Sequence, residues 1–140
     1  MTRNDICRQV RDIAVKLSED ESLRRWCGIC STALAKLFIK HGYDATLCYG
    51  YCVDSFYQHC WIESSGKIYD ITLTQFDKII DKNKLRNIPE IFIDDIDYEN
   101  IYFLKEQYNP EDDEQLEQLF EQWPDNQKPF DKLQHFTLIE

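Results

Sequence analysis

The chain of 140 residues has the length of one domain and can bury a substantial core. Its composition, 43% hydrophobic and 30% charged, is typical of a globular protein and excludes an intrinsically disordered chain. No apolar run approaches the roughly 18 residues of a membrane span, so we expect no membrane association. Residues 1–140 are therefore expected to form a single domain.

The net charge of −10 is concentrated in the last third of the chain. Residues 1–89 carry 13 Lys and Arg against 11 Asp and Glu, whereas residues 90–140 carry 3 against 15. Such an acidic segment would repel phosphates, so nucleic-acid binding is not expected. We interpret the acidic third, residues 90–140, as a solvated surface of the same domain; the alternative is a docking surface for a basic partner.

The N-terminal residues are charged throughout and contain no apolar signal core, which predicts a cytoplasmic protein. The same pattern is compatible with delivery into another cell as an effector. Without a secretion signal, the cysteines are expected to be reduced and mostly buried and not to form a disulfide scaffold. They are Cys7, Cys27, Cys30, Cys48, Cys52 and Cys60.

Helical spacing of apolar residues predicts a first helix over residues 5–17, capped by Asn4 or Asp5. After a polar break the helical spacing resumes at Gly28 and stops at Gly42, which places Cys30 in the first turn of a second helix. The unpaired backbone N–H groups and the positive dipole end of that turn favour a thiolate and suit a developing oxyanion.

Alternating patterns predict strands over residues 44–53 and 56–63, and a turn after Glu63 leads back into a short strand over residues 67–71. His59 and Trp61 share the face opposite Cys60. In this hairpin Asp70 is expected close enough to His59 to accept its ring N–H. Cys30, His59 and Asp70 are thus a candidate nucleophile, base and orienting carboxylate.

The remaining chain is expected to add two helices, over residues 72–84 and 109–123, and three short strands, over residues 90–97, 101–104 and 130–139. Asn109 and Pro110 predict the start of the second of these helices, and Pro124 its end. We expect its apolar stripe to pack on its own domain. That stripe consists of Leu116, Leu119, Phe120 and Trp123.

Three stretches, GICSTALAKLF at 28–38, HCW at 59–61 and YDIT at 69–72, occur in the order of three motifs of one enzyme family. They resemble the nucleophile helix, the His-small-Trp strand and the apolar-Asp-x-Thr strand of the transglutaminase-like branch of the papain-like cysteine protease superfamily. The match covers about 50 of the 140 residues. The resemblance implies an α+β, papain-like fold with the nucleophile helix packed against an antiparallel sheet.

By the same resemblance Cys30 is the nucleophile, His59 the base and Asp70 the orienting group, with no metal or other cofactor. The implied activity is a cysteine-dependent amide hydrolase, a peptidase or glutamine deamidase, that acts on a protein or peptide through a thioester. A transglutaminase that passes the acyl group to an amine is the alternative. We place Trp26, Gly28 and Trp61 in the substrate and oxyanion region. The second oxyanion donor stays open, because the upstream glutamine of many papain-like enzymes is not found.

Three other interpretations of these residues remain. Residues 26–30, WCGIC, resemble the thioredoxin redox motif, although no buried strand precedes them, and a reversible Cys27–Cys30 disulfide would switch the nucleophile off. Cysteines and His59 could bind zinc, although adjacent His59 and Cys60 face opposite sides of a strand. A non-catalytic binding module could also share the fold.

Overall fold

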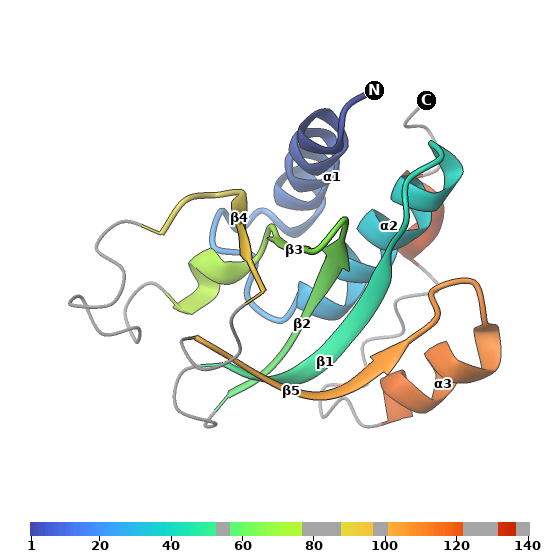
Figure 1. The fold of residues 1–140 in the computed structure, drawn as a ribbon. Helices are drawn as coiled ribbons and strands as arrows, with labels where there is room; N and C mark the ends of the chain where they lie inside the picture. The colour runs from blue at the N-terminus through green and yellow to red at the C-terminus, as the bar shows by residue number, and fades with distance from the viewer. Residues whose placement is uncertain (53–56, 77–87, 97–100, 122–131, 137–140) are drawn as a thin grey trace.

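Figure 1 shows the computed structural model of the chain, which describes residues 1–52, 57–76, 88–96, 101–121 and 132–136. The helices are α1 (Arg3–Ser18), α2 (Cys27–Lys40) and α3 (Asp113–Glu121), with short 3-10 turns η1 (Leu73–Phe76) and η2 (Gln134–Phe136). The strands are β1 (Thr46–Cys52), β2 (Tyr57–Ser64), β3 (Lys67–Asp70), β4 (Phe92–Asp95) and β5 (Tyr102–Tyr108).

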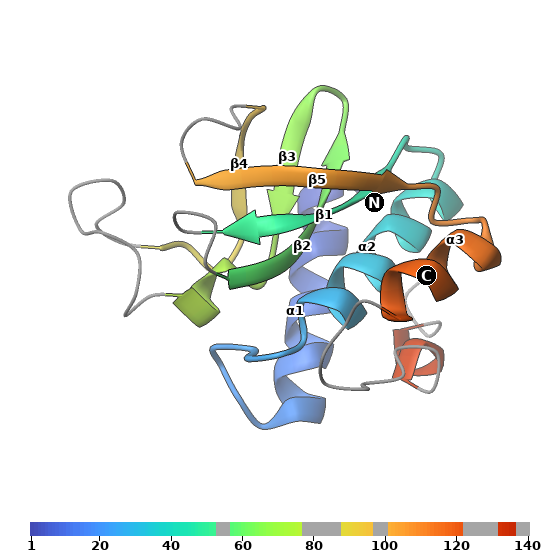
Figure 2. The ribbon, with the colours of Figure 1, turned by 90° about the horizontal axis from the view of Figure 1, so that it is seen from below.

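The described strands form one antiparallel sheet with the order β4-β3-β2-β1-β5, so the fold is α+β as expected. Figure 2 shows α1 and α2 on one side of this sheet. Helix α2 packs on β1 and β2, and α1 packs on α2. This layering brings the first turn of α2 against the middle strand of the sheet.

Helix α1 is confirmed, but its cap lies earlier than expected. The Thr2 hydroxyl accepts the Asp5 N–H at 3.1 Å, and the Asp5 carboxylate accepts the Thr2 N–H at 3.0 Å. This reciprocal pair satisfies two of the otherwise unpaired donors at the helix start. The apolar face of α1, represented by Ile6 and Val10, is fully buried.

Helix α2 begins at Cys27, one residue before the predicted Gly28, and this shift decides which cysteine occupies the helix start. Its C-terminal end is as predicted: Gly42 follows the C-cap with φ of 88°, and its N–H donates to the Ile39 carbonyl at 3.0 Å. That left-handed conformation suits glycine, which has no Cβ to clash.

The predicted hairpin is present. β2 and β3 pair antiparallel with Ile62 opposite Tyr69 and Ser64 opposite Lys67, around the turn at Ser65 and Gly66. The predicted division of β2 between two faces is also confirmed. Cys60 and Ile62 belong to the core beneath α2, whereas Trp61 belongs to a second core on the opposite face.

At the other edge of β1 the backbone of β5 comes unusually close at Gly50. A Cβ built on Gly50 would lie 2.1 Å from the Phe103 carbonyl oxygen, so only glycine fits there. The β1–β5 register also shifts between Tyr49 and Gly50. The glycine therefore allows the close pairing that attaches β5 to the sheet.

Helix α3 begins later than predicted, at Asp113. Asn109 and Pro110 form the preceding turn, and the Asp112 carboxylate accepts the N–H groups of Glu114 and Gln115 at 3.1 and 3.3 Å. The stronger cap is therefore Asp112, because its acceptor faces the helix N–H groups directly. The predicted end of this helix at Pro124 lies outside the described residues.

The prediction of a closing strand over residues 130–139 is wrong in its described part, because residues 132–136 are helical. The predicted helix over residues 72–84 is represented by η1 alone, and its remaining residues lie outside the described ranges. The predicted strands over 90–97 and 101–104 correspond to β4 and β5, although β5 extends to Tyr108.

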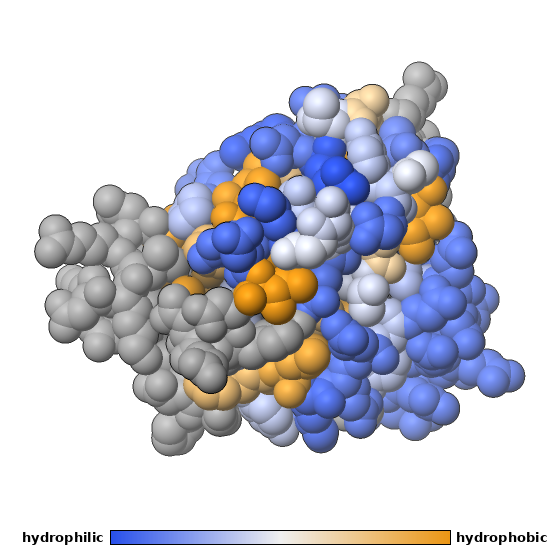
Figure 3. Space-filling view, in the orientation of Figure 1, coloured by the Kyte–Doolittle hydropathy of each residue, from blue (hydrophilic) through white to orange (hydrophobic). Residues whose placement is uncertain are grey.

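The apolar stripe of α3 packs inward, as expected for Leu116 and Leu119, which are fully buried. Acidic residues of this helix, including Glu114 and Glu117, are exposed. Figure 3 shows hydrophilic side chains over the part of the surface where α3 lies in Figure 1. No helix among the described residues is long and apolar enough to span a bilayer.

Candidate functional site

His59 and Asp70 lie together, as the hairpin predicted. The ring Nε2 of His59 is 2.6 Å from the Asp70 carboxylate, and both side chains are completely buried. The register places Asp70 next to Trp61 across the strand pair, so the carboxylate reaches His59 diagonally on the same face. With Nε2 engaged by Asp70, Nδ1 is the ring nitrogen left for another partner.

Asp70 is held ionised by a set of donors. It accepts the Thr72 N–H at 2.9 Å and the Tyr102 hydroxyl at 2.8 Å in addition to the imidazole. Burial favours the neutral carboxyl, but the charge and hydrogen bond of His59 and these donors lower the pKa of Asp70 below its ordinary value. With the Thr72 hydroxyl at 3.3 Å as a further donor, this buried carboxylate is a fixed negative charge behind the imidazole.

The thiol that meets His59 is that of Cys27. Cys27 is the first residue of α2, and its thiol lies beside the His59 ring and interacts with its charge. Burial by itself would raise its pKa, but hydrogen bonds from the Cys60 thiol and the His59 ring, with the charge of His59, lower the pKa of Cys27 to about 5. Burial likewise opposes the imidazolium, yet Asp70 and Cys27 raise the pKa of His59 to about 10.

These opposite shifts describe a thiolate–imidazolium pair at neutral pH. The start of α2 also favours the thiolate. Trp26 provides no side-chain cap, and among the described residues the N–H groups of Cys27, Gly28 and Ile29 donate to no backbone carbonyl. These first-turn N–H groups and the helix dipole place positive potential next to the sulfur.

Cys60 shows how α2 docks on β2. Because β3 ends at Asp70, the edge of β2 next to β3 has no strand partner at Cys60. Its carbonyl instead accepts the Ser31 hydroxyl at 3.1 Å, and its backbone N–H helps to lower the pKa of the neighbouring Cys27 thiol. The first turn of α2 therefore lies where the next residue of β3 would pair with Cys60, and it holds the Cys27 sulfur against the sheet.

Cys30, the predicted nucleophile, is not the residue that the structure brings to His59. Its N–H already donates to the Trp26 carbonyl at 2.8 Å, so it lies within the helical hydrogen-bond ladder. Burial, together with the nearby Cys27 charge, raises the pKa of Cys30 well above the ordinary thiol value. Among the described residues of α2, Cys27 is the cysteine that lies beside the imidazole.

The residues assigned to the substrate and oxyanion region have different surroundings. Trp26 is the N-cap of α2, with the Lys132 ammonium 4.6 Å from its ring centre. Gly28 is buried in the first turn, next to Cys27. Trp61 is fully buried behind the imidazole, with its ring 6.0 Å from that of His59, and its indole N–H has no hydrogen-bond partner among the described residues.

Two site residues were not identified from the sequence. Tyr102 comes from β5, stacks 6.2 Å from the His59 ring and donates to Asp70. Gln75 comes from η1, and its amide nitrogen lies 3.4 Å from His59 Nδ1. Neither residue belongs to a motif. The sequence offered one indication that Gln75 lies near the site, which is its position five residues after Asp70.

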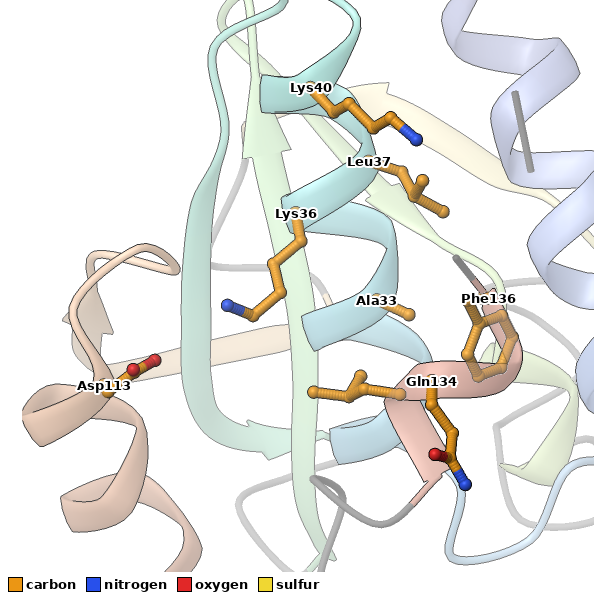
Figure 4. Close-up of a pocket in the computed structure, with 8 residues that line it drawn as sticks. Ala33, Lys36, Leu37, Lys40, Asp113, Gln134 and Phe136 are labelled. Atoms are coloured by element: carbon orange, nitrogen blue, oxygen red, sulfur yellow. The ribbon is translucent and has the colours of Figure 1, made fainter. Parts of the chain in front are cut away.

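The site is closed, because Cys27 is 1% exposed and His59 is fully buried. A separate cavity of about 390 Å³ lies on the outer side of α2, between α2, α3 and η2 (Figure 4). Apolar side chains such as Leu37 and Phe136 line it, with Lys36 and Lys40 nearby, and none of the site's side chains does. In the described ranges no group of three His, Cys, Asp or Glu side chains could hold a metal ion.

Compared with protein-family models, curated protein sequences and solved structures, the chain gives no match. The function is therefore argued from the geometry of the site.

Proposed function

We propose that the protein is a cysteine-dependent amide hydrolase, a peptidase or glutamine deamidase, that works through a thioester at Cys27. The observation that carries the proposal is the buried His59–Asp70 hydrogen bond, with the Cys27 thiol beside the same imidazole and its pKa lowered by it. A low-pKa thiol, a base and an orienting carboxylate are the parts that nucleophilic acyl transfer needs. The same parts serve a transglutaminase, which differs in the acceptor that resolves the thioester.

The fold supports a papain-like or transglutaminase-like assignment. In that arrangement a nucleophile helix packs against an antiparallel sheet whose strands supply the base and the carboxylate. Here α2 packs on β1 and β2, with His59 in β2 and Asp70 at the end of β3. The nucleophile shifts from Cys30, the second cysteine of residues 27–30, to Cys27, the first, whereas the His59 and Asp70 assignments are unchanged.

In the proposed mechanism the Cys27 sulfur attacks the carbonyl carbon of an amide, and the carbon–oxygen π pair moves to oxygen. First-turn N–H groups of α2 stabilise the oxyanion. When the intermediate collapses, the carbon–nitrogen bond breaks, and His59 gives its Nδ1 proton to the leaving amine. Water, deprotonated by His59, then releases the acyl group from sulfur. Asp70 keeps Nδ1 aimed at the sulfur throughout.

The experiment is acylation by p-nitrophenyl acetate, followed by nitrophenolate release and intact mass. We expect one acetyl group on Cys27, lost in Cys27→Ala and at least tenfold slower in His59→Ala. Cys30→Ala is the matched control, three residues along the same helix, and it should acylate like the wild type. Acylation that survives Cys27→Ala, or that Cys30→Ala abolishes, would refute the proposal. Ammonia release from glutamine peptides, with and without an added amine, then separates hydrolysis from transfer.

A second candidate function, thiol peroxidase chemistry, is favoured by the interaction of the neighbouring Cys60 and Cys27 thiols, which shifts the pKa of each. The Cys27 thiolate would attack hydrogen peroxide, forming an S–O bond as the O–O bond breaks and hydroxide leaves as water. The Cys60 sulfur would then displace a second water from that sulfenic acid to form a disulfide. The two sulfurs supply the two electrons that reduce the peroxide.

Peptide mapping after stoichiometric peroxide distinguishes this candidate from the first. A redox function predicts a Cys27–Cys60 disulfide that Cys60→Ala removes and Cys30→Ala leaves intact. Pairing of Cys27 with Cys30, or oxidation of Cys27 to sulfinic acid without a disulfide, would contradict it. The hydrolase proposal predicts that Cys60→Ala still forms the acetyl thioester.

A further inference from the structure

The amide of Gln75 is held at the site with its NH₂ group facing inward. Its oxygen is 3.4 Å from the Arg25 backbone nitrogen, and its nitrogen is 3.4 Å from His59 Nδ1. The Arg25 N–H can only donate, so the atom facing it must be the amide oxygen. The two N–H groups of Gln75 therefore point toward the ring nitrogen that also serves Cys27.

That nitrogen cannot be the lasting acceptor for Gln75. Nε2 of His59 is engaged with Asp70, and in the thiolate–imidazolium pair Nδ1 carries a proton. Two donors, Nδ1–H and the Gln75 amide, then lie next to each other at the ring nitrogen that serves Cys27. A substrate carbonyl oxygen that becomes negative next to the Cys27 sulfur could accept the hydrogen bond that a protonated Nδ1 cannot accept from the Gln75 amide.

The segment that carries Gln75 is tied to the segment that leads into α2. The Arg11 guanidinium, only 2% exposed, donates to the carbonyls of Ile71 and Glu21, each at 2.5 Å. The Thr74 hydroxyl donates to the Ser22 carbonyl at 3.3 Å. These hydrogen bonds cross-link residues 20–25 to residues 71–76.

The loop before α2 is itself held in an unusual conformation, with φ of 55° at Leu23 and 66° at Arg25. Such left-handed conformations are strained for residues other than glycine and persist where the surroundings impose them. The strained Arg25 peptide supplies the N–H that orients Gln75. The position of the amide is therefore built into the fold.

We propose that Gln75 is the second donor to the oxyanion formed when Cys27 attacks a carbonyl, together with the backbone N–H groups at the start of α2. The inference rests on the proposed hydrolase function and gives it the missing donor, from a segment after Asp70 and not from one before the nucleophile. As sulfur bonds to the carbonyl carbon and the π pair moves to oxygen, the Gln75 N–H donates to that oxygen. When the pair returns and the leaving group departs, the hydrogen bond is released.

The test compares two reactions of the full-length protein at the same thiolate. Acetylation by p-nitrophenyl acetate passes through an oxyanion, whereas alkylation by iodoacetamide does not. For Gln75→Ala and for the similarly sized Gln75→Glu, we expect acetylation to slow at least about tenfold, toward the 10²-fold typical of a lost oxyanion donor. Alkylation of Gln75→Ala should stay within about twofold of the wild type.

Gln58→Ala is the matched control, because this neighbouring glutamine donates to the Tyr49 hydroxyl at 2.8 Å and should change neither rate. A parallel fall of both rates in Gln75→Ala would make Gln75 a positioning residue for the ion pair and overturn the proposal. No change in either rate would overturn it as well. If the wild type is acetylated no faster than Cys27→Ala, the hydrolase function itself fails, which is a distinct result.

Discussion

The assignment of Cys27 in place of Cys30 can be decided by the pH dependence of thiol alkylation. The pKa of Cys27 is lowered to about 5, whereas burial raises the pKa of Cys30 well above the ordinary value. The perturbation is His59→Ala, which removes the imidazolium that stabilises the thiolate. The observable is the second-order rate with iodoacetamide, with the labelled residue identified by peptide mass.

The expected difference in alkylation rate between Cys27 and an ordinary thiol depends on two opposing effects. At pH 5.5 a thiol with a pKa near 5 is about three-quarters ionised, whereas an ordinary thiol is about 0.1% ionised, roughly a 750-fold difference. A thiolate is also less nucleophilic as its pKa falls, by about 40-fold over 3.5 pKa units at a Brønsted slope of 0.4–0.5. Cys27 should therefore react about twentyfold faster than an ordinary thiol at pH 5.5, and about equally fast at pH 7.

The shape of the profile is thus more informative than the rate at neutral pH. We expect the wild-type rate to level off above about pH 6, with all early label on Cys27. In His59→Ala the rate at pH 5.5 should fall about twentyfold and should rise with pH through neutrality. Because Cys27 is 1% exposed, any opening needed for access scales the rate without shifting the inflection, provided the opening itself does not titrate. A wild-type rate that rises tenfold per pH unit from 5.5 to 8, or first labelling at Cys30, would refute this reasoning.

Three further predictions concern stability, each measured by urea unfolding. Gly50→Ala should cost about 3 kcal/mol, because the new methyl would lie 2.1 Å from a carbonyl oxygen of β5; an unchanged midpoint would contradict the close β1–β5 pairing. Tyr102→Phe should cost about 1.5–3 kcal/mol by removing a donor from the buried Asp70 carboxylate, and a loss below about 0.5 kcal/mol would show that Asp70 does not need it. The raised pKa of His59 gives stability that is fully present below about pH 6.5 and is lost as the pH rises through about 10. The lowered pKa of Cys27 gives stability that is fully present above about pH 8.5 and is lost as the pH falls through about 5. The stability difference between the wild type and a His59→Gln, Cys27→Ser double variant should therefore be largest between pH 6.5 and 8.5, and a monotonic dependence on pH would exclude the ion pair.

The sequence was sufficient to predict the pairing of His59 with Asp70, because a two-residue turn at Ser65 and Gly66 fixes the register of its hairpin. It was not sufficient to choose between Cys27 and Cys30. Residues three apart lie on nearly the same side of a helix, so periodicity fits both. The choice depends on the exact first residue of the helix, which periodicity locates only within a few residues.

The roles of Tyr102 and Gln75 could not be predicted from sequence patterns, for a different reason. Tyr102 reaches Asp70 from β5, at the other side of β1, so its role depends on the strand order of the whole sheet. The placement of Gln75 depends on Arg11, a buried guanidinium that bonds carbonyl groups 10 and 60 residues away in the chain. Contacts of this kind follow from tertiary packing and leave no local periodicity.

The early end of β3 has a consequence for how this architecture can vary. A hairpin longer by one residue pair would extend β3 along β2 to Cys60, and would occupy the Cys60 carbonyl that now accepts the Ser31 hydroxyl and the Cys60 N–H that now faces the Cys27 sulfur. The sheet would gain two backbone hydrogen bonds, and α2 would lose its contacts with the Cys60 backbone. The proposed reactivity of Cys27 and further pairing of β3 with β2 are therefore mutually exclusive, so the proposed chemistry requires a short β3.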